Sequence, residues 1–230
     1  MNDILNGAWQ ALQLIFDRDA ATWQIIELSL RVSGFALLFS ALAGIPLGAL
    51  LGLRAFRART LAVALVYTGM GFPPVVIGLF VYLLLSRSGP LGFLGWLFTP
   101  SAMVAAQTVI SFPVIAGFTM AAVQGVEPAL RIQLRALGAT GGQIARTILW
   151  EARGGVFVAV IAGFGSIISE VGAVMLVGGN IEGSTRVLTT AIVLETRQGA
   201  FDMALALAFV LLGITFMINL LMLRLQGRVA

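Results

Sequence analysis

Apolar residues form five long runs along the chain, and short polar connections separate them. A helix rises about 1.5 Å per residue, so each run is long enough to cross about 30 Å of hydrocarbon. No linker interrupts the series, and residues 1–230 are therefore expected to form a single all-α polytopic membrane domain. The predicted spans are, approximately, Ile25–Leu53, Leu61–Leu85, Ala102–Val123, Val156–Val177 and Phe201–Leu223.

Residues 1–22, which precede and enter the first span, have a different pattern. Their apolar side chains recur at helical spacing, and Asn, Asp and Gln occupy the opposite face. This pattern predicts an amphipathic helix that lies at the outer interface or against the bundle. An anchoring role for this helix is favoured over a role in partner docking.

The distribution of arginine predicts the orientation of the chain, which contains no lysine. Cytoplasmic segments of membrane proteins carry an excess of basic residues. With the N-terminus outside and the C-terminus inside, nine arginines flank the inner ends of the spans and four flank the outer ends, while Arg31 lies near the outer end of the first span. These arginines are not interleaved with aromatic residues, so nucleic-acid binding is not expected.

The composition excludes several kinds of chemistry. Hydrophobic residues make up 59% of the 230 residues and charged residues 10%, and the chain has no histidine, cysteine or lysine. A Walker A phosphate loop, a Cys/His metal site and a Ser-His-Asp triad all need residues from that missing set. We therefore expect no catalytic residue, metal site or cofactor on this chain. If nucleotide drives transport here, ATP and Mg²⁺ bind to a partner ATPase.

The longest polar connection, residues 124–155, is expected on the cytoplasmic side. Its central part predicts two short helices, residues 131–138 and 142–152, folded about Gly138 and the Gly141-Gly142 pair. Such a hairpin at a membrane surface can receive force from a partner. Four arginines are expected to be exposed on it: Arg131, Arg135, Arg146 and Arg153.

Prolines interrupt the second and third spans. Pro73 and Pro74 lie in the second span, and Pro113 follows Ser111 and Phe112 in the third. Proline removes a backbone donor, so a bend is expected at each place. Two interpretations stay open: kinked packing, or hinges that work during alternating access.

Glu170 is the outstanding charged residue within a span. Counted from Val156, it lies about 20 Å into the membrane, past the midplane toward the outside. A carboxylate at that depth is costly, so it is expected to face protein and to be hydrogen-bonded or protonated. Its candidate partners are Ser166, Ser169 and backbone groups near Gly163, Gly165 and Gly172. A hinge or gate role is favoured over direct contact with cargo, because a carboxylate repels an anion.

The segment that follows, residues 179–199, leaves the membrane at Asn180. The semi-apolar stretch Val187–Leu194 predicts a short helix that dips back toward the bundle. We therefore expect a re-entrant element near the outer mouth, covered by protein.

Several motifs together resemble a known family. The turn Leu137-Gly138-Ala139, with Ile148 ten residues after the glycine, resembles the cytoplasmic signature of ABC-importer permeases, although the usual EAA reads Ile-Gln-Leu at residues 132–134 and the usual LP reads Trp-Glu at residues 150–151. SEVGA followed by GGNIEGSTRVLTTAI resembles permeases for molybdate and sulfate. FPPVVIGLFVYLLLSRSGPLG, LRALGAT and TRVLTTAIVLET are similar to tungstate permeases, and that similarity runs from about Leu28 to Leu223.

The resemblance implies a type I ABC importer permease fold and an ATP-driven transport cycle in a bacterial or archaeal cytoplasmic membrane. It also implies a homodimer of this chain, two cytoplasmic ABC ATPase subunits and an extracytoplasmic oxyanion-binding protein that meets outer loops 87–100 and 180–199. Tungstate is the expected cargo. Molybdate and sulfate are alternatives, and a secondary transporter driven by an ion gradient, with Glu170 as its coupling group, is the alternative of another class.

The resemblance implies a coupling role for the hairpin turn, while the gate, pathway and hinge roles are expected from the chemistry of the residues themselves. ATPase coupling is expected at Arg135, Leu137, Gly138, Ala139 and Arg146. The gate or pathway is expected to include Glu170, Ser169, Ser111 and Asn180. Hinges are expected at Pro73, Pro74 and Pro113.

Overall fold

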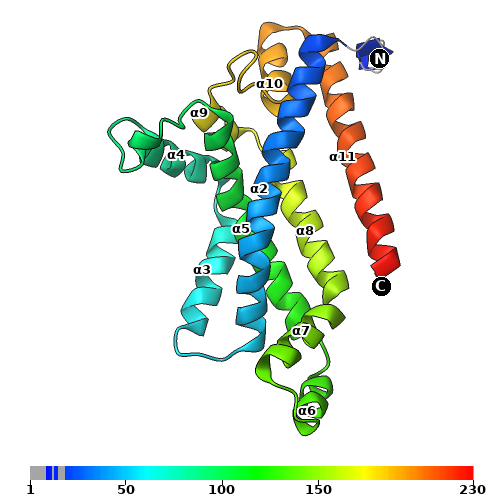
Figure 1. Cartoon of the computed structure of the whole chain (residues 1–230). Helices are drawn as coiled ribbons and strands as arrows, with labels where there is room; N and C mark the ends of the chain where they lie inside the picture. Colours follow the sequence, from blue (N-terminus) through cyan, green and yellow to red (C-terminus); the bar gives the residue numbers. More distant parts are fainter. Residues whose placement is uncertain (1–8, 12, 15–18, 230) are drawn as a thin grey trace.

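The computed structural model describes residues 9–11, 13, 14 and 19–229, and in that part of the chain all regular structure is helical. The all-α class is confirmed. The α-helices are α2 (Ala20–Leu53), α3 (Arg59–Gly71), α4 (Pro74–Leu85), α5 (Pro100–Gln124), α6 (Pro128–Ala136), α7 (Gly141–Glu151), α8 (Arg153–Ile168), α9 (Gly172–Gly178), α10 (Leu188–Gln198) and α11 (Phe201–Val229), and η1 (Gly92–Leu94) is a 3-10 turn (Figure 1).

Three of the five predicted spans are single long apolar helices, α2, α5 and α11. The second span is divided into α3 and α4, whose axes differ by 103° at the break before Pro74. The fourth span was predicted as one helix and this prediction is wrong, because α8 ends at Ile168 and α9 begins at Gly172. A further bend of 67° separates α7 from α8.

The most extensive helix contact joins α2 to α5, and glycines make it possible. Gly44, Gly48 and Gly52 recur every fourth residue of α2, so they share one face. A Cβ added at Gly48 would lie 2.8 Å from Cβ of Thr119, and one added at Gly52 would lie 2.8 Å from a methyl group of Val123. Small residues at this spacing allow membrane helices to approach with their backbones in close contact.

Hydrogen bonds and buried apolar side chains hold α2 to its neighbours at three points along its length. Near the middle, Oγ of Ser40 donates to the carbonyl oxygen of Thr108 (3.0 Å). Toward the start of α2, Oγ of Ser29 accepts from the amide of Leu188 (2.8 Å) and so holds the beginning of α10. At the other end, Ala49 packs with Val123 and Ile148 in a buried cluster that reaches α7.

The α6–α7 hairpin and the start of α2 lie at opposite ends of the molecule (Figure 1). The α6–α7 hairpin lies at one end, beside the last turn of α2. The start of α2 lies at the opposite end with α10, and α4 projects sideways from the bundle next to α9. α11 packs mainly against α10 and contacts α8.

Most of the predicted amphipathic helix of residues 1–22 lies outside the described residues. In the described part, residues 9–11 are helical, and Ala11 is buried in a cluster with Ile26 and Leu188. Helix α2 begins after Asp19, whose carboxylate accepts hydrogen bonds from the hydroxyl (2.6 Å) and the amide (2.8 Å) of Thr22. The bond from the Thr22 hydroxyl, and then that from its amide, lower the pKa of Asp19 below its ordinary value.

The glycine contact between α2 and α5 leads to a stability prediction. We expect Gly48→Ala to destabilise the folded protein by about 1–3 kcal/mol, because the new methyl group overlaps the backbone of α5. Gly34→Ala is the matched control, since no heavy atom lies within 4 Å of a Cβ built there and alanine favours a helix. Thermal unfolding in detergent, followed by helical circular dichroism, measures both. Equal effects of the two substitutions would contradict the packing argument.

Candidate functional site

The break between α8 and α9 is built around Glu170. The amide of Ala173, in the first turn of α9, donates to Oε1 of Glu170 (2.8 Å). The hydroxyl of Thr189 in α10 donates to the carbonyl oxygen of Glu170 (3.0 Å). Glu170, which precedes the N-cap residue Val171, therefore supplies an acceptor to the first turn of α9 with its side chain and connects the break to α10 with its backbone. A partner among the backbone groups near Gly172 was predicted, but the prediction of Ser166 and Ser169 as partners is wrong, because their hydroxyls donate to carbonyl oxygens of α8.

Close packing against α4 determines where α9 lies. A Cβ added at Gly78 would lie 2.9 Å from Cβ of Ala173, and one added at Gly172 would overlap the side chain of Val75. Helix α4 reaches this position because the chain turns by 103° at Pro73 and Pro74. Pro73 is the cap residue of α4 and Pro74 its first residue, positions that suit proline because no helical amide bond is needed there.

The other proposed hinge, Pro113, has a different environment. It lies in the interior of α5, and α5 continues as one helix through it. A Cβ added at Gly69 of α3 would lie 2.9 Å from Cβ of Pro113, so this proline packs against the helix that precedes the bend. A hinge role for each of the three prolines stays a prediction.

The remaining residues predicted for the gate or pathway lie in different surroundings. Ser169 is exposed, and its hydroxyl donates to the carbonyl oxygen of Gly165 (3.0 Å). Ser111 is fully buried in α5, where its hydroxyl faces Gly163 of α8. Asn180 follows α9 in a left-handed conformation with a φ of 52°. The described contacts therefore leave Ser111 and Asn180 apart from the Glu170 carboxylate.

Sequence reasoning named Ser111 but missed Gln107 and Thr119, two further buried polar residues of α5. Gln107 and Ser111 lie one turn apart on the side of α5 that meets α8, whereas Thr119 faces Gly48 of α2. Nε2 of Gln107 donates to the carbonyl oxygen of Ile167, at the end of α8 (3.1 Å). Oε1 of Gln107 and the hydroxyls of Ser111 and Thr119 are buried without a hydrogen-bond partner among the described protein groups. Polar residues within an otherwise apolar span were the signal that could have identified this set.

The hairpin of α6 and α7 has the two helices that the residue pattern predicted. Gly138 has a φ of 79°, which favours glycine, and the amide of Ala139 donates to the carbonyl oxygen of Leu134 (3.0 Å). Helix α7 starts with a capping box, in which the amide of Thr140 donates to Oε1 of Gln143 (2.7 Å). The turn therefore has a defined shape.

Two of the four hairpin arginines differ from the prediction that all are exposed. Arg135 and Arg146 are exposed, whereas Arg131 and Arg153 are half-buried. Nη2 of Arg131 donates to the carbonyl oxygen of Val123 at the end of α5 (3.0 Å). The guanidinium of Arg153 lies 4.8 Å from the ring centroid of Trp150, which is a cation–π contact.

The exposed surface of the hairpin is more apolar than the arginines suggested. Leu137 is 83% exposed, Trp150 68% and Ile132 67%, while Ile148 beneath them is completely buried. Arg131 and Ile148 anchor the hairpin to α5, so the hairpin that bears these three apolar side chains is held in a defined position. A set of exposed apolar groups with flanking arginines is typical of a protein-binding surface.

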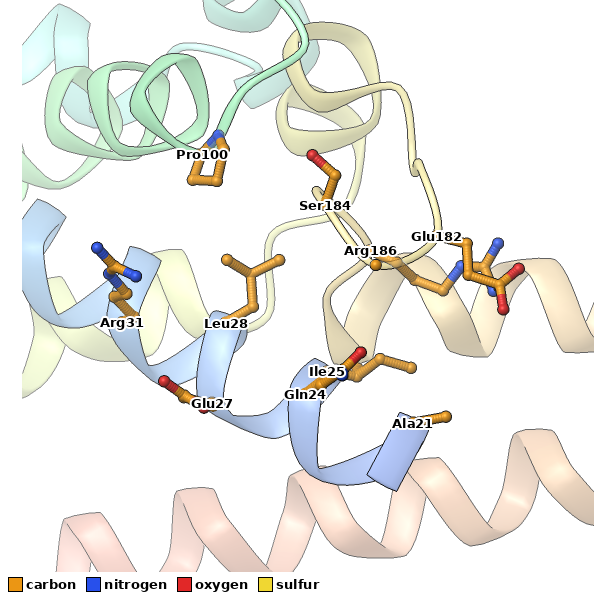
Figure 2. A pocket seen from close by; sticks show the side chains of 11 residues that line it. Ala21, Gln24, Ile25, Glu27, Leu28, Arg31, Pro100, Glu182, Ser184 and Arg186 are labelled. Carbon is orange, nitrogen blue, oxygen red and sulfur yellow. The ribbon is translucent and has the colours of Figure 1, made fainter. Parts of the chain in front are cut away.

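A pocket of about 430 Å³ lies at the opposite end of the molecule, between the start of α2, the start of α5 and the loop after α9 (Figure 2). Figure 2 shows Arg31 on one side and Glu182 and Arg186 on the other, with Leu28 between them. Nη1 of Arg186 lies 3.4 Å from Oε2 of Glu182. The pocket thus combines the apolar side chains of Ile25 and Leu28 with charges of both signs, and Glu27 lies one helical turn from Arg31 on α2.

Comparison with known proteins shows which family this chain resembles. A family profile described as "Binding-protein-dependent transport system inner membrane component" matches residues 44–230. A relative from Haloferax volcanii, "Probable anion ABC transporter permease protein", is 44% identical over 89% of this chain and 90% of its own length. "Tungstate uptake system permease protein TupB" of Peptoclostridium acidaminophilum is 40% identical over 98% of this chain and 99% of its own.

A solved structure has the same fold. The MetNI methionine ABC transporter, in an inward-facing conformation, contains a chain that matches with a TM-score of 0.75. The match covers 94% of this chain and 98% of that one, with 20% sequence identity. The fold of an ABC importer permease is therefore confirmed.

The capping contact of Glu170 can be tested with two substitutions. We expect Glu170→Ala to weaken the start of α9 by about 0.5–2 kcal/mol, because the Ala173 amide loses its acceptor. Glu170→Gln keeps an acceptor oxygen and is expected to stay close to the native protein. Hydrogen exchange at the Ala173 amide measures the difference.

Ser169→Ala is the neighbouring control, since its hydroxyl bonds back within α8 and its loss should leave exchange at Ala173 unchanged. If Glu170→Gln accelerated exchange as much as Glu170→Ala, the negative charge rather than the acceptor oxygen would stabilise α9, and the capping explanation would be wrong.

Proposed function

The chain belongs to the family of inner membrane components of binding-protein-dependent transport systems, and we propose that it is the permease subunit of an importer that carries tungstate into the cell. ATP hydrolysis in a separate subunit drives this transport in the proposal. The observation that carries it is the alignment with a tungstate uptake permease over 98% of the chain. The fold, shared with an ABC importer permease, agrees with this function.

We propose that the α6–α7 hairpin is the surface that receives the ATPase. Leu137, Ile132 and Trp150 supply exposed apolar contacts, and Arg135 and Arg146 lie beside them with exposed side chains. Burial of apolar surface in a cleft of the ATPase would stabilise such a complex. Gly138 and Ala139 give the turn its shape. Two copies of this chain would form the pathway, each with one ATPase bound to its hairpin.

The break at Glu170 supports a gate role for this residue. Its carboxylate accepts the Ala173 amide and its carbonyl oxygen accepts the Thr189 hydroxyl, so one residue joins α9 to α10. A movement of α9 relative to α10 therefore changes the contacts of Glu170. An ion-gradient transporter would instead use this carboxylate to bind the coupling ion, and family membership favours the ATP-driven mechanism.

We propose that the end of the molecule with the Arg31 pocket faces outward and meets the oxyanion-binding protein. The basic hairpin then faces the cytoplasm, in agreement with the positive-inside rule. The charged rim of the pocket, Arg31 with Glu182 and Arg186, suits the polar edge of a protein interface. In this arrangement the chain resides in a bacterial or archaeal cytoplasmic membrane with both ends of its spans occupied by partners.

Transport can be tested by ATP hydrolysis in liposomes that contain the permease, its ATPase and the binding protein. We expect tungstate to stimulate hydrolysis, and we expect stimulation at lower concentrations by tungstate than by molybdate or sulfate. Leu137→Asp should abolish the stimulation, because it places a charge in the proposed apolar contact with the ATPase. Leu137→Met is the matched control and should retain it.

Co-purification of the ATPase with each variant separates the two parts of the proposal. If the complex assembled but responded to molybdate or sulfate and not to tungstate, the cargo would be wrong. If Leu137→Asp bound the ATPase and coupled as well as Leu137→Met did, the hairpin would not be the coupling surface.

The orientation can be tested with single cysteines, because the native chain has none. Leu137→Cys places a thiol on the hairpin, and Ser88→Cys places one on the exposed loop between α4 and α5. In intact cells that express the permease alone, a membrane-impermeant maleimide should label Ser88→Cys, and should label Leu137→Cys only after permeabilisation. The opposite labelling pattern would reverse the proposed orientation.

A further inference from the structure

An open groove of about 690 Å³ runs along the contact between α2 and α5. Helices α2 and α5 run in the same direction here (Figure 1), and the groove follows both for about two turns. Its walls are almost entirely apolar below Arg31, and Phe35 and Phe39 stack on its α2 side with ring centroids 6.4 Å apart. The lining residues on which the argument depends are Arg31, Phe35, Phe39, Trp96, Ala105 and Val109.

The polarity of the groove changes along its length. Arg31 and Trp96 line it with Pro100 and Ser101, which begin α5, whereas Phe39 and Val109 line it two turns further along the helices. One end therefore offers a cation and an indole, and the other offers aliphatic and aromatic surface together with Thr108, whose hydroxyl donates to the carbonyl oxygen of Val104 within α5. An indole ring commonly occupies the level of the lipid head groups, with its apolar body toward the acyl chains.

The depth of Arg31 agrees with this gradient. At 1.5 Å per residue, Arg31 lies about 33 Å along α2 from Leu53, which is close to the thickness of the hydrocarbon layer. With the orientation proposed above, Leu53 lies at the inner boundary, so Arg31 lies at the level of the outer head groups. Phe35 and Phe39 then lie at the level of the acyl chains.

Arg31 has no hydrogen bond or ion pair with any other residue in the part of the chain that the structure describes. A guanidinium at the edge of an apolar groove is stabilised by an anionic partner, and it binds phosphate oxygens in a forked geometry. The pocket in Figure 2 opens on the other side of Arg31 and shares Arg31 and Pro100 with the groove. Glu27, one helical turn before Arg31, and Glu182 also line this pocket, so its carboxylates suit the amine of a zwitterionic head group such as phosphatidylethanolamine.

We propose that this groove binds one phospholipid of the outer leaflet, with its phosphate at Arg31 and an acyl chain along Phe35, Phe39 and Val109. The phosphate of such a molecule would pair with the charge of Arg31, and its acyl chain would cover the apolar surface below Arg31. A free oxyanion would pair with Arg31 but would leave the apolar walls uncovered. The site would help to hold α2 and α5 at a fixed height in the membrane, and it goes beyond the transport of cargo.

Lipid retention in native mass spectrometry tests the site. The full-length permease in complex with its ATPase is titrated with phosphatidylethanolamine, and one bound lipid per permease chain is expected. Arg31→Gln should weaken this binding by about tenfold, since one charge-assisted contact is lost. Ala105→Phe should also weaken it, because the larger side chain fills the groove. Arg87→Gln, which removes an exposed charge from the α4–α5 loop, is the matched control and should leave lipid binding unchanged.

Trp96 offers an independent readout of the same site. In a variant with Trp9, Trp23 and Trp150 replaced by Phe, a phospholipid with brominated acyl chains should quench Trp96 fluorescence, and Arg31→Gln should reduce the quenching. Equal lipid binding by Arg31→Gln and the native chain would overturn the proposal.

Two other outcomes would also overturn it. Displacement of the lipid signal by tungstate or inorganic phosphate alone would assign Arg31 to the cargo route. Conversion of a dimer to a monomer by Ala105→Phe, with no change in bound lipid, would show that a second copy of the chain covers the groove.

Discussion

The close contact between α2 and α5 is the constraint on which the rest of the structure depends. Gly44, Gly48 and Gly52 allow the two backbones to meet, and no larger side chain fits at Gly48 or Gly52 without movement of α5. Lipid supplies little hydrophobic driving force for helix association, so shape complementarity and hydrogen bonds have to hold the pair together. The other elements attach to it: α10 through Ser29, and the hairpin through Val123.

This arrangement connects the two ends of the molecule by contiguous contacts. Arg131 and Ile148 fasten the hairpin to the end of α5. About four turns earlier on α5, Gln107 donates to the carbonyl oxygen of Ile167, three residues before Glu170. A displacement of the hairpin would therefore act on a well-packed pair of helices rather than on separate loops. Interfaces that are packed in this way change between discrete arrangements and do not deform continuously.

The sequence predicted the fold where the physical cause is local. Apolar length identified α2, α5 and α11, and the Gly and Thr residues of the hairpin turn identified α6 and α7. Hydropathy could not reveal the break after Ile168, because the residues on both sides are equally apolar and the cap on α9 is a contact that exists only in the fold. Arg131 was expected to be exposed for the same reason: its acceptor, the carbonyl oxygen of Val123, becomes available where α5 ends.

The membrane-spanning helices have few charges, and the buried polar groups of α5 that lack a partner among the described residues indicate that α5 can adopt a second packing. The described spans contain no lysine, and the cation Arg31 lies toward the start of α2, so a dianion transported as proposed would meet no deep cationic trap. On α5, Oε1 of Gln107 and the hydroxyls of Ser111 and Thr119 are buried without a protein partner. A buried polar group without a hydrogen bond costs about 1–3 kcal/mol, so these three groups require water or another arrangement of α5 against α2 and α8. Either requirement reduces the free-energy difference between this packing of α5 and an alternative packing. A small difference of this kind would allow ATP binding in a partner subunit, as proposed above, to select one of the two conformations.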